Sequence, residues 1–216
     1  MEVGANHPTK FSQTWFLEQR GWRGLLVEPL AAKCELLRQH RPGSRVFQVA
    51  AGTPSQRGRA RFTVAAGDDM LSGLQVQLGV TPDLAVEVDV RTLDDLIAEA
   101  GNPRLDLVSI DVEGTELDVL RGFDLARHQP ALVLIEDHLQ RLDVHRHMVR
   151  HRYRLVKRTG CNNWYVPVSA KFWLTSPGEK LRLWKELRLD TPVRCVRFYF
   201  KRRLASRCQE PTALRS

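Results

Sequence analysis

Short apolar runs alternate with helix-like periodic segments in the first part of the chain. A strand-length run at Gly24–Glu28 precedes a helical pattern from Leu30 to His40, and a second run follows at Arg45–Ala50. Because parallel strands need a crossover between them, usually a helix, this alternation predicts a mostly parallel sheet flanked by helices. We therefore expect an α/β fold.

Two later apolar runs extend this pattern. Leu105–Ile110 and Ala131–Ile135 have the length of buried strands and are too short for ordinary helices. Between them, Thr115 to Arg121 is predicted to form a helix. The sheet is thus expected to continue through this part of the chain.

Antiparallel structure is predicted between residues 51 and 91. Gly-rich turns surround the strand-like segments Arg61–Val64 and Val86–Val90, which indicates an insertion or a pair of crossing strands. Thr92 with Asp95 then has the pattern of a capping box that opens the next helix.

The sheet is predicted to end in a hairpin, after which the chain changes character. Tyr153–Val156 and Trp164–Val166 flank the turn Gly160–Asn163, which is the arrangement of a terminal hairpin. We assign residues 1–168 to one domain and residues 169–216 to a basic, amphipathic C-terminal extension.

Composition favours one globular unit. The 216 residues are 43% hydrophobic, enough for one substantial core. No run approaches the roughly 20 apolar residues of a membrane-spanning helix, and the polar opening Met1–Gly4 is unlike a signal peptide, so we expect a cytoplasmic protein. Four cysteines show neither disulfide nor zinc spacing and are interpreted as free thiols: Cys34, Cys161, Cys195 and Cys208.

The positive charge is concentrated in the C-terminal third of the chain. The net charge is +8, but residues 141–216 hold 19 of the 33 Lys and Arg residues and only 5 of the 25 Asp and Glu residues. Residues 1–140 are therefore mildly acidic. An acidic core with a basic tail is typical of an enzyme with an attached electrostatic contact surface rather than of a uniformly basic nucleic-acid binder.

A glycine turn and a later carboxylate have the spacing of a nucleoside-binding site. Gly4 lies between a short first strand and a helix predicted from Phe11 to Gln19, where glycine lets a ligand approach the backbone. Glu28 ends the next strand, where a carboxylate can accept hydrogen bonds from both ribose hydroxyls. Taken alone, each residue equally fits an ordinary turn or strand end. Since a GxGxxG loop is absent, a cofactor without a pyrophosphate is favoured over NAD or FAD.

An acid-rich segment follows the run at Leu105–Ile110. Asp111 is expected at the carboxyl end of its strand, the edge at which open α/β sheets bind ligands. Glu113 and Glu116 also fit a simpler role, in which a carboxylate complements the positive N-terminus of the following helix. Asp111 is thus the stronger functional candidate.

Three blocks of the sequence resemble the signature blocks of FkbM methyltransferases. They are Val3–Asn6, Gly21–Pro29 and Ile110–Gly122. The similarity covers roughly residues 1–166, including the turn at Gly160–Tyr165. This resemblance implies a Rossmann-like methyltransferase fold that uses S-adenosylmethionine and acts mainly on sugar or polyketide hydroxyls. Compared with that family, the first strand is short, since only Met1–Val3 precede Gly4.

The resemblance also implies which residues form the cofactor site. Those expected to contact the cofactor are Glu2, Gly4, Asn6, Glu28, Ala50, Ala51 and Asp111. Ala50 or Ala51, after the third strand, is expected near the adenine, and Asp111 near the methionine end of S-adenosylmethionine.

Methyl transfer to a hydroxyl requires alignment of the reacting atoms and a base that removes the proton. His138 is the first candidate for that base, with Asp111 as a further catalytic residue and His7 as a weaker alternative. A surface histidine fits position 138 equally well. The segment Asp68–Gly73 falls where a substrate loop is expected, although a polar turn explains it more simply.

We expect no metal site. His145, His147 and His151 are close in sequence, but the three arginines interspersed with them would repel a cation.

The basic C-terminal region has three interpretations. From Gly178 to Leu204, apolar and aromatic residues alternate with Lys and Arg, and Pro192 is expected to interrupt helical structure. The region can contact an anionic membrane surface at the inner membrane face, pack on the domain with a solvated basic face, or contact RNA.

Three functions from different classes therefore compete. They are an O-methyltransferase acting on a sugar, glycan or polyketide-like hydroxyl, a nucleic-acid-binding or RNA-modifying protein, and a non-catalytic membrane-associated remnant. The methyltransferase is favoured, and a nucleic-acid partner is not, because the acidic core and the segment Asp111–Gly122 need no nucleic acid.

Overall fold

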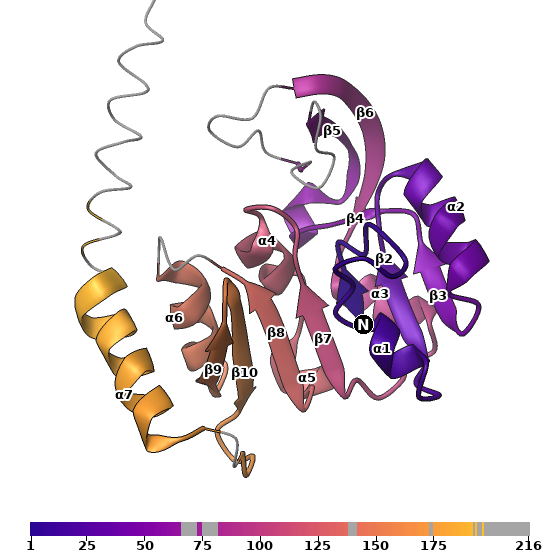
Figure 1. The fold of residues 1–216 in the computed structure, drawn as a ribbon. Coiled ribbons are helices and arrows are strands. Elements are labelled where there is room, and N and C mark those ends of the chain that lie inside the picture. Colours follow the sequence, from indigo (N-terminus) through magenta and orange to yellow (C-terminus); the bar gives the residue numbers. More distant parts are fainter. Residues whose placement is uncertain are drawn as a thin grey trace, which may run out of the picture.

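A seven-stranded sheet forms the centre of the protein (Figure 1). The structure is a computed structural model that describes residues 1–65, 73–74, 82–137, 142–172, 175–191, 193 and 196, apart from the side chains at 65 and 82–84. In spatial order, the strands of this sheet are β3 (Ser44–Phe47), β2 (Gly24–Val27), β1 (Glu2–Val3), β7 (Leu107–Ile110), β8 (Leu132–Glu136), β10 (Asn162–Pro167) and β9 (Tyr153–Thr159). The predicted mixed α/β architecture is confirmed.

The directions of the strands follow from their pairings. Strands β3, β2, β1, β7 and β8 pair in parallel, whereas β10 is antiparallel to both β8 and β9, which confirms the predicted hairpin. The chain moves from β1 outward to β3 and later places β7 and β8 on the other side of β1. The strand order therefore reverses between β1 and β7, and open α/β sheets bind ligands at such a reversal.

Helices lie between the strands and after the last of them. They are α1 (Trp15–Glu18), α2 (Ala31–His40), α3 (Leu93–Glu99), α4 (Glu116–Arg121), α5 (Leu125–His128), α6 (Asp143–Arg150) and α7 (Pro177–Lys185), with the short helical turns η1 (Pro54–Gln56) and η3 (Glu186–Asp190). Helix α3 begins at the predicted capping box, in which the Thr92 hydroxyl accepts a hydrogen bond from the Asp95 amide at 3.2 Å.

Apolar clusters cover both faces of the sheet. Adjacent residues of one strand contribute to different clusters, because successive side chains of a strand point to opposite faces. Val27 belongs to the main apolar core, together with buried residues of α3, α4 and α6. The preceding residue, Leu26, is fully buried against Leu37 of α2. Adjacent positions of β2 thus contribute to separate apolar clusters.

The first helix is shorter than the sequence pattern predicts. We expected Phe11 to Gln19, but α1 covers only Trp15–Glu18. Phe11 has a φ of 60°, in the left-handed region that a helix does not use. The groups that follow it, including the Gln13 amide, donate hydrogen bonds to the buried Glu2 carboxylate. The prediction was wrong because this carboxylate holds the segment as a loop.

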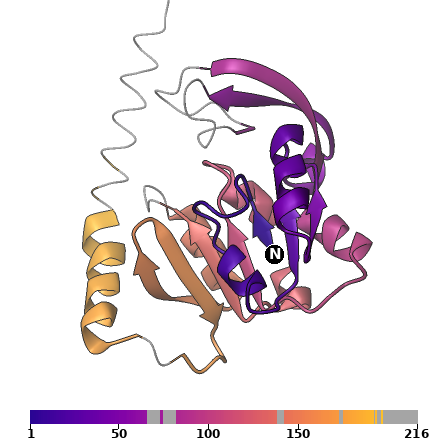
Figure 2. The same cartoon turned by 45° about the vertical axis from the view of Figure 1, so that its right-hand side comes forward.

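Strands β4, β5 and β6 form a second sheet, as the predicted antiparallel insertion requires. Strand β4 (Ala50–Ala51) is parallel to β6 (Pro82–Arg91), and β6 is antiparallel to β5 (Gly58–Ala65). The run at Arg45–Ala50 is therefore divided between two sheets instead of forming one strand. Figures 1 and 2 both show the β5–β6 hairpin arching over the main sheet.

Helix α7 covers the edge strand β9. The Thr175 hydroxyl donates to the Val156 carbonyl at 2.7 Å, and Arg182 donates to the Arg158 carbonyl at 2.9 Å. These contacts satisfy carbonyl groups that an edge strand otherwise exposes. The predicted interruption at Pro192 lies outside the described residues, and the division into residues 1–168 and 169–216 stays a prediction. Of the helices that are described, none has the length and apolar character needed to cross a bilayer.

Candidate functional site

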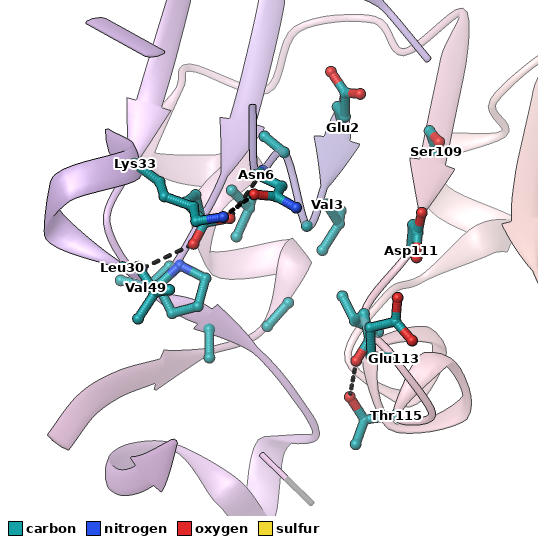
Figure 3. Close-up of a pocket in the computed structure, with 18 of the residues that line it drawn as sticks. Glu2, Val3, Asn6, Leu30, Lys33, Val49, Ser109, Asp111, Glu113 and Thr115 are labelled. Carbon is teal, nitrogen blue, oxygen red and sulfur yellow. Dashed lines mark hydrogen bonds between the residues drawn. The ribbon is translucent and has the colours of Figure 1, made fainter. Parts of the chain in front are cut away.

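A cleft opens at the carboxyl ends of the parallel strands, where the strand order reverses. It is lined by the segments that follow β1, β2, β3 and β7 (Figure 3). The cleft brings together every residue that the sequence analysis expected at a cofactor: Glu2, Gly4, Asn6, Glu28, Ala50, Ala51 and Asp111.

The turn after β1 requires glycine at position 4. Gly4 has a φ of 80°, and a Cβ at this position would lie 1.7 Å from the carbonyl oxygen of Asp111. The amides of Gly4 and Ala5 both donate to the Val27 carbonyl, at 2.9 and 3.1 Å. The backbone is thus held between β2 and β7, where a larger residue would push the strands apart.

The Glu28 carboxylate is fixed at the end of β2. It is 4% exposed, and its two oxygens accept hydrogen bonds from the amides of Asn6 and Leu30, both at 2.9 Å. Lys33 donates to the Asn6 side chain (Figure 3), and the Cys34 thiol donates to the Glu28 carbonyl at 3.0 Å. Burial raises the pKa of Cys34 to about 12, so this thiol stays protonated. The carboxylate therefore faces the cleft in one orientation.

Apolar residues form the part of the cleft next to the small sheet. Ala50 and Ala51 of β4 are buried and line the cleft together with Phe62 of β5. Ala50 and Phe62 belong to one apolar cluster, against which Leu30 and Leu74 pack. This part of the cleft is therefore apolar and includes two small side chains.

The Glu2 carboxylate holds the loop between β1 and α1. It is 4% exposed and accepts hydrogen bonds from the Gln13 amide at 2.7 Å and the Thr14 hydroxyl at 2.5 Å. Arg41, which is 1% exposed, lies 3.6 Å from Glu2 and bonds to Glu18 at 2.5 Å. The guanidinium compensates both buried carboxylates. Glu2 thus positions the loop that borders the cleft, and its direct contact with a cofactor stays a prediction.

Asp111 and Glu136 lie next to each other at the ends of the neighbouring strands β7 and β8. Ile110 pairs with Ile135 between β7 and β8, so the residues that follow emerge at the same edge. One carboxylate oxygen from each of Asp111, Glu136 and Glu113 lies within 4.8 Å of the other two. Burial, a hydrogen bond with Glu136 and repulsion from the nearby carboxylates raise the pKa of Asp111 to about 9. This environment favours the protonated form of Asp111.

Comparison with known proteins adds the family to this geometry. Residues 2–158 match the Methyltransferase FkbM domain. The chain belongs to the FkbM methyltransferase family. A segment of 40 residues is 52% identical to the protein named Methyltransferase 1 of Beauveria bassiana (strain ARSEF 2860). That segment spans 18% of this chain and 16% of the fungal protein. These findings support a methyltransferase.

Two histidines of this FkbM domain were candidates for the base. The imidazole Nδ1 of His7 accepts hydrogen bonds from the amides of Thr9 and Lys10, at 3.1 and 3.0 Å, so it shapes a turn beside the cleft. It is not among the described residues that line the cleft. His138 and residues 68–72 of the expected substrate loop lie outside the described residues, and their roles stay predictions.

The histidines near α6 interact with one another and with the hairpin. The rings of His147 and His151 stack with their centroids 4.2 Å apart, and His145 Nδ1 lies 3.3 Å from the Tyr165 hydroxyl. Burial and the neighbouring positive groups lower the pKa of His147 to about 4.

Within the described chain, the group whose spacing could suit a metal ion consists of the three carboxylates around Asp111. The sequence pattern did not predict this group.

Sequence reasoning also missed two partners of the site residues. Glu136 ends the strand next to that of Asp111, and the Cys161 thiol donates to it at 2.9 Å. A signal was present, because Glu136 follows an apolar run just as Asp111 does. Lys33 lies in the first turn of α2 and bonds to Asn6, a contact across 27 positions that no sequence spacing reveals.

Proposed function

We propose that the chain is an S-adenosylmethionine-dependent O-methyltransferase acting on a hydroxyl of a sugar, glycan or polyketide-like small molecule. The observation that carries this proposal is the buried, fixed Glu28 carboxylate at the end of β2, in the cleft of a methyltransferase domain. An acidic side chain at this position of a parallel sheet can accept hydrogen bonds from ribose hydroxyls.

The cleft fits the parts of this cofactor. The Glu28 oxygens accept hydrogen bonds from the amides of Asn6 and Leu30, and carboxylate oxygens can accept hydrogen bonds from ribose hydroxyls as well. Ala50 and Phe62 offer apolar surface for the adenine, and Gly4 lets a ligand approach the backbone after β1. The carboxylates around Asp111 offer negative charge to an ammonium group at the methionine end.

The contribution of the chain to the reaction is alignment and control of protons. When bound, S-adenosylmethionine supplies an activated methyl group to the acceptor oxygen. The walls of the cleft orient that oxygen, which is a positioning effect. The raised pKa of Asp111 favours its protonated form, which can donate a hydrogen bond, whereas ionised carboxylates accept hydrogen bonds from hydroxyls. We retain His138 as the proposed base that takes the acceptor's proton at an imidazole nitrogen.

The acidic surroundings of Asp111 support a hydroxyl acceptor. Asp111 and Glu113 line one side of the cleft, Glu136 lies beside them, and Glu116 lies close enough to contribute to the raised pKa of Asp111. Carboxylates attract hydroxyl donors but repel phosphates, so a polyanion such as RNA fits this cleft poorly. A neutral polyhydroxyl compound is the better match.

Calorimetric titration with S-adenosylmethionine and its demethylated product tests the proposal. We expect saturable binding by the wild type, weakened at least about tenfold in Glu28→Ala because a charge-assisted hydrogen bond is lost. Glu28→Gln, which keeps one acceptor oxygen, should lose less. Glu35→Ala on the exposed face of α2 is the matched control and should bind like the wild type.

Two outcomes would overturn the proposal. The first is the absence of saturable binding by wild-type protein whose circular dichroism and thermal unfolding show a folded state. The second is equal affinity of the wild type and Glu28→Ala. If binding is as expected, transfer of a labelled methyl group to neutral polyhydroxyl compounds, followed by mass spectrometry, identifies the acceptor class.

A further inference from the structure

The outer face of the C-terminal helix carries apolar side chains that are more than half exposed. Their exposed fractions range from 52% to 67%. We call these five residues the apolar stripe: Leu181, Trp184, Leu189, Val193 and Val196. Figures 1 and 2 both show α7 as the outermost element beside β9, and no described element covers the outer face of α7. The inner face, by contrast, buries Leu183.

The spacing of the stripe fits a helix that contains a π turn. Successive members are three, five, four and three residues apart. Steps of three and four keep side chains on one face of an α-helix, but a step of five does not. The step of five, from Trp184 to Leu189, coincides with the π turn Glu186–Asp190. Because π hydrogen bonds run from i to i+5, this turn accommodates an extra residue and keeps the stripe continuous.

The charges of the helix are sorted between its two faces. Glu179 lies 3.7 Å from Lys157, and Glu186 lies 3.2 Å from Arg158, so these acids pair with basic residues of β9. Among the exposed basic residues described between 177 and 191, Arg182 bonds to the Arg158 carbonyl of β9, and the others are Lys180, Lys185 and Arg188. The outward surface therefore combines apolar side chains with positive charge.

We propose that this face of the helix docks on an anionic membrane surface. The stripe enters the boundary between headgroups and acyl chains, and the basic residues contact the anionic headgroups. Four of the five stripe residues are aliphatic and cannot stack on nucleic-acid bases, which makes RNA the poorer partner. A symmetric contact with a second copy would bring positive charges together, which opposes dimer formation through this face.

Sedimentation of the full chain with lipid vesicles tests the electrostatic part of the proposal. We expect binding to phosphatidylcholine vesicles that contain phosphatidylglycerol, no binding to phosphatidylcholine alone, and a decrease with rising salt. Changing Lys180, Lys185 and Arg188 together to Gln should lower the partition coefficient about fivefold for each charge removed. The control removes three exposed charges elsewhere and should retain most of the binding: Arg38→Gln, Arg104→Gln and Arg127→Gln.

A second pair of variants tests the apolar part. Trp184→Ala with Leu189→Ala should weaken vesicle binding about tenfold or more, because buried apolar area is lost at the interface. Val149→Ala with Val168→Ala removes apolar side chains that are 50% and 49% exposed on other elements, and should leave binding unchanged. All four sites are exposed, so thermal unfolding should show the fold intact.

The proposal fails if the wild type does not bind vesicles that contain phosphatidylglycerol, or if the stripe variant binds them as the wild type does. It also fails if a single-stranded RNA binds more tightly than these vesicles at the same salt concentration. Finally, it fails if sedimentation velocity without lipid finds a wild-type dimer that the stripe variant dissociates, since the stripe would then be an interface between copies.

Discussion

Charged side chains near the cleft act largely through their buried partners. Arg41 compensates the carboxylates of Glu2 and Glu18, while Glu28 is held by backbone amides on either side. Asp111 differs from these residues, because burial and its acidic neighbours raise its pKa. These arrangements make stability near the cleft depend on single ionisable residues.

Arg41→Met should destabilise the protein by about 3–5 kcal/mol, because it leaves two buried carboxylates without their cation. The buried guanidinium also bonds to the Thr14 hydroxyl at 3.0 Å and the Pro8 carbonyl at 3.2 Å, so the loop beside the cleft loosens as well. Urea unfolding measures the change. Arg38→Met, at a side chain that is 45% exposed, is the control and should cost less than about 1 kcal/mol. Equal effects of the two substitutions would contradict the assigned role of Arg41.

Asp111→Asn should flatten the pH dependence of stability. The pKa of Asp111 is raised from 3.8 to about 9 in the folded protein, so the folded state holds a proton that the unfolded chain releases. The free energy of unfolding therefore falls as pH rises across this window, and the asparagine variant lacks this contribution. Urea unfolding at several pH values within the window tests it. An identical slope for both proteins would show that Asp111 is ionised in the fold.

At the scale of single elements, local sequence patterns predicted several strands but overestimated the length of one helix. The runs that became β2, β7 and β8 were predictable because buried strands are apolar along their whole length. The helix expected at Phe11–Gln19 covers only Trp15–Glu18. The Glu2 carboxylate, which is distant in sequence, accepts a hydrogen bond from the Gln13 amide and so holds the start of that segment as a loop. Glu136 was missed for a related reason, since its proximity to Asp111 depends on strand register rather than on spacing in the sequence.

Thr92→Ala should cost about 1 kcal/mol by removing the cap of α3. The Thr92 hydroxyl accepts from the Asp95 amide, and the Asp95 carboxylate accepts from the Thr92 amide at 3.3 Å. Thr92→Ser keeps the hydroxyl and should lose clearly less stability in thermal unfolding. If serine and alanine were equally destabilising, the methyl group of this buried threonine rather than its cap would account for the loss.

At the scale of the whole molecule, the basic C-terminal part of the chain contacts the rest of the protein through the packing of α7 on β9. Thr175, just before the helix, and Arg182 of the helix donate hydrogen bonds to carbonyl groups of the edge strand. Two ion pairs, from Glu179 and Glu186 to β9, reinforce this contact. The C-terminal region therefore covers the edge strand of the sheet and also forms a charged surface.

Deleting residues 169–216 should make the protein associate, because it uncovers the edge strand β9. A chain that ends at residue 191 keeps α7 and the π turn and should behave like the full chain. Sedimentation velocity compares the three proteins, and thermal unfolding should show the lowest midpoint for the shortest chain. If the chain of residues 1–168 stays monomeric and equally stable, α7 does not protect the edge.

The thiol of Cys34 has a consequence for how the cleft can be observed. It is fully buried, stays protonated and donates to the backbone carbonyl of Glu28. Only a thiolate reacts readily with alkylating reagents, so modification of Cys34 must wait until the segment after β2 opens. The rate of that modification reports how often the end of the cleft at Glu28 unfolds locally. A binding isotherm does not report this rate. The protein thus contains a native kinetic reporter next to the residue on which its proposed chemistry most depends.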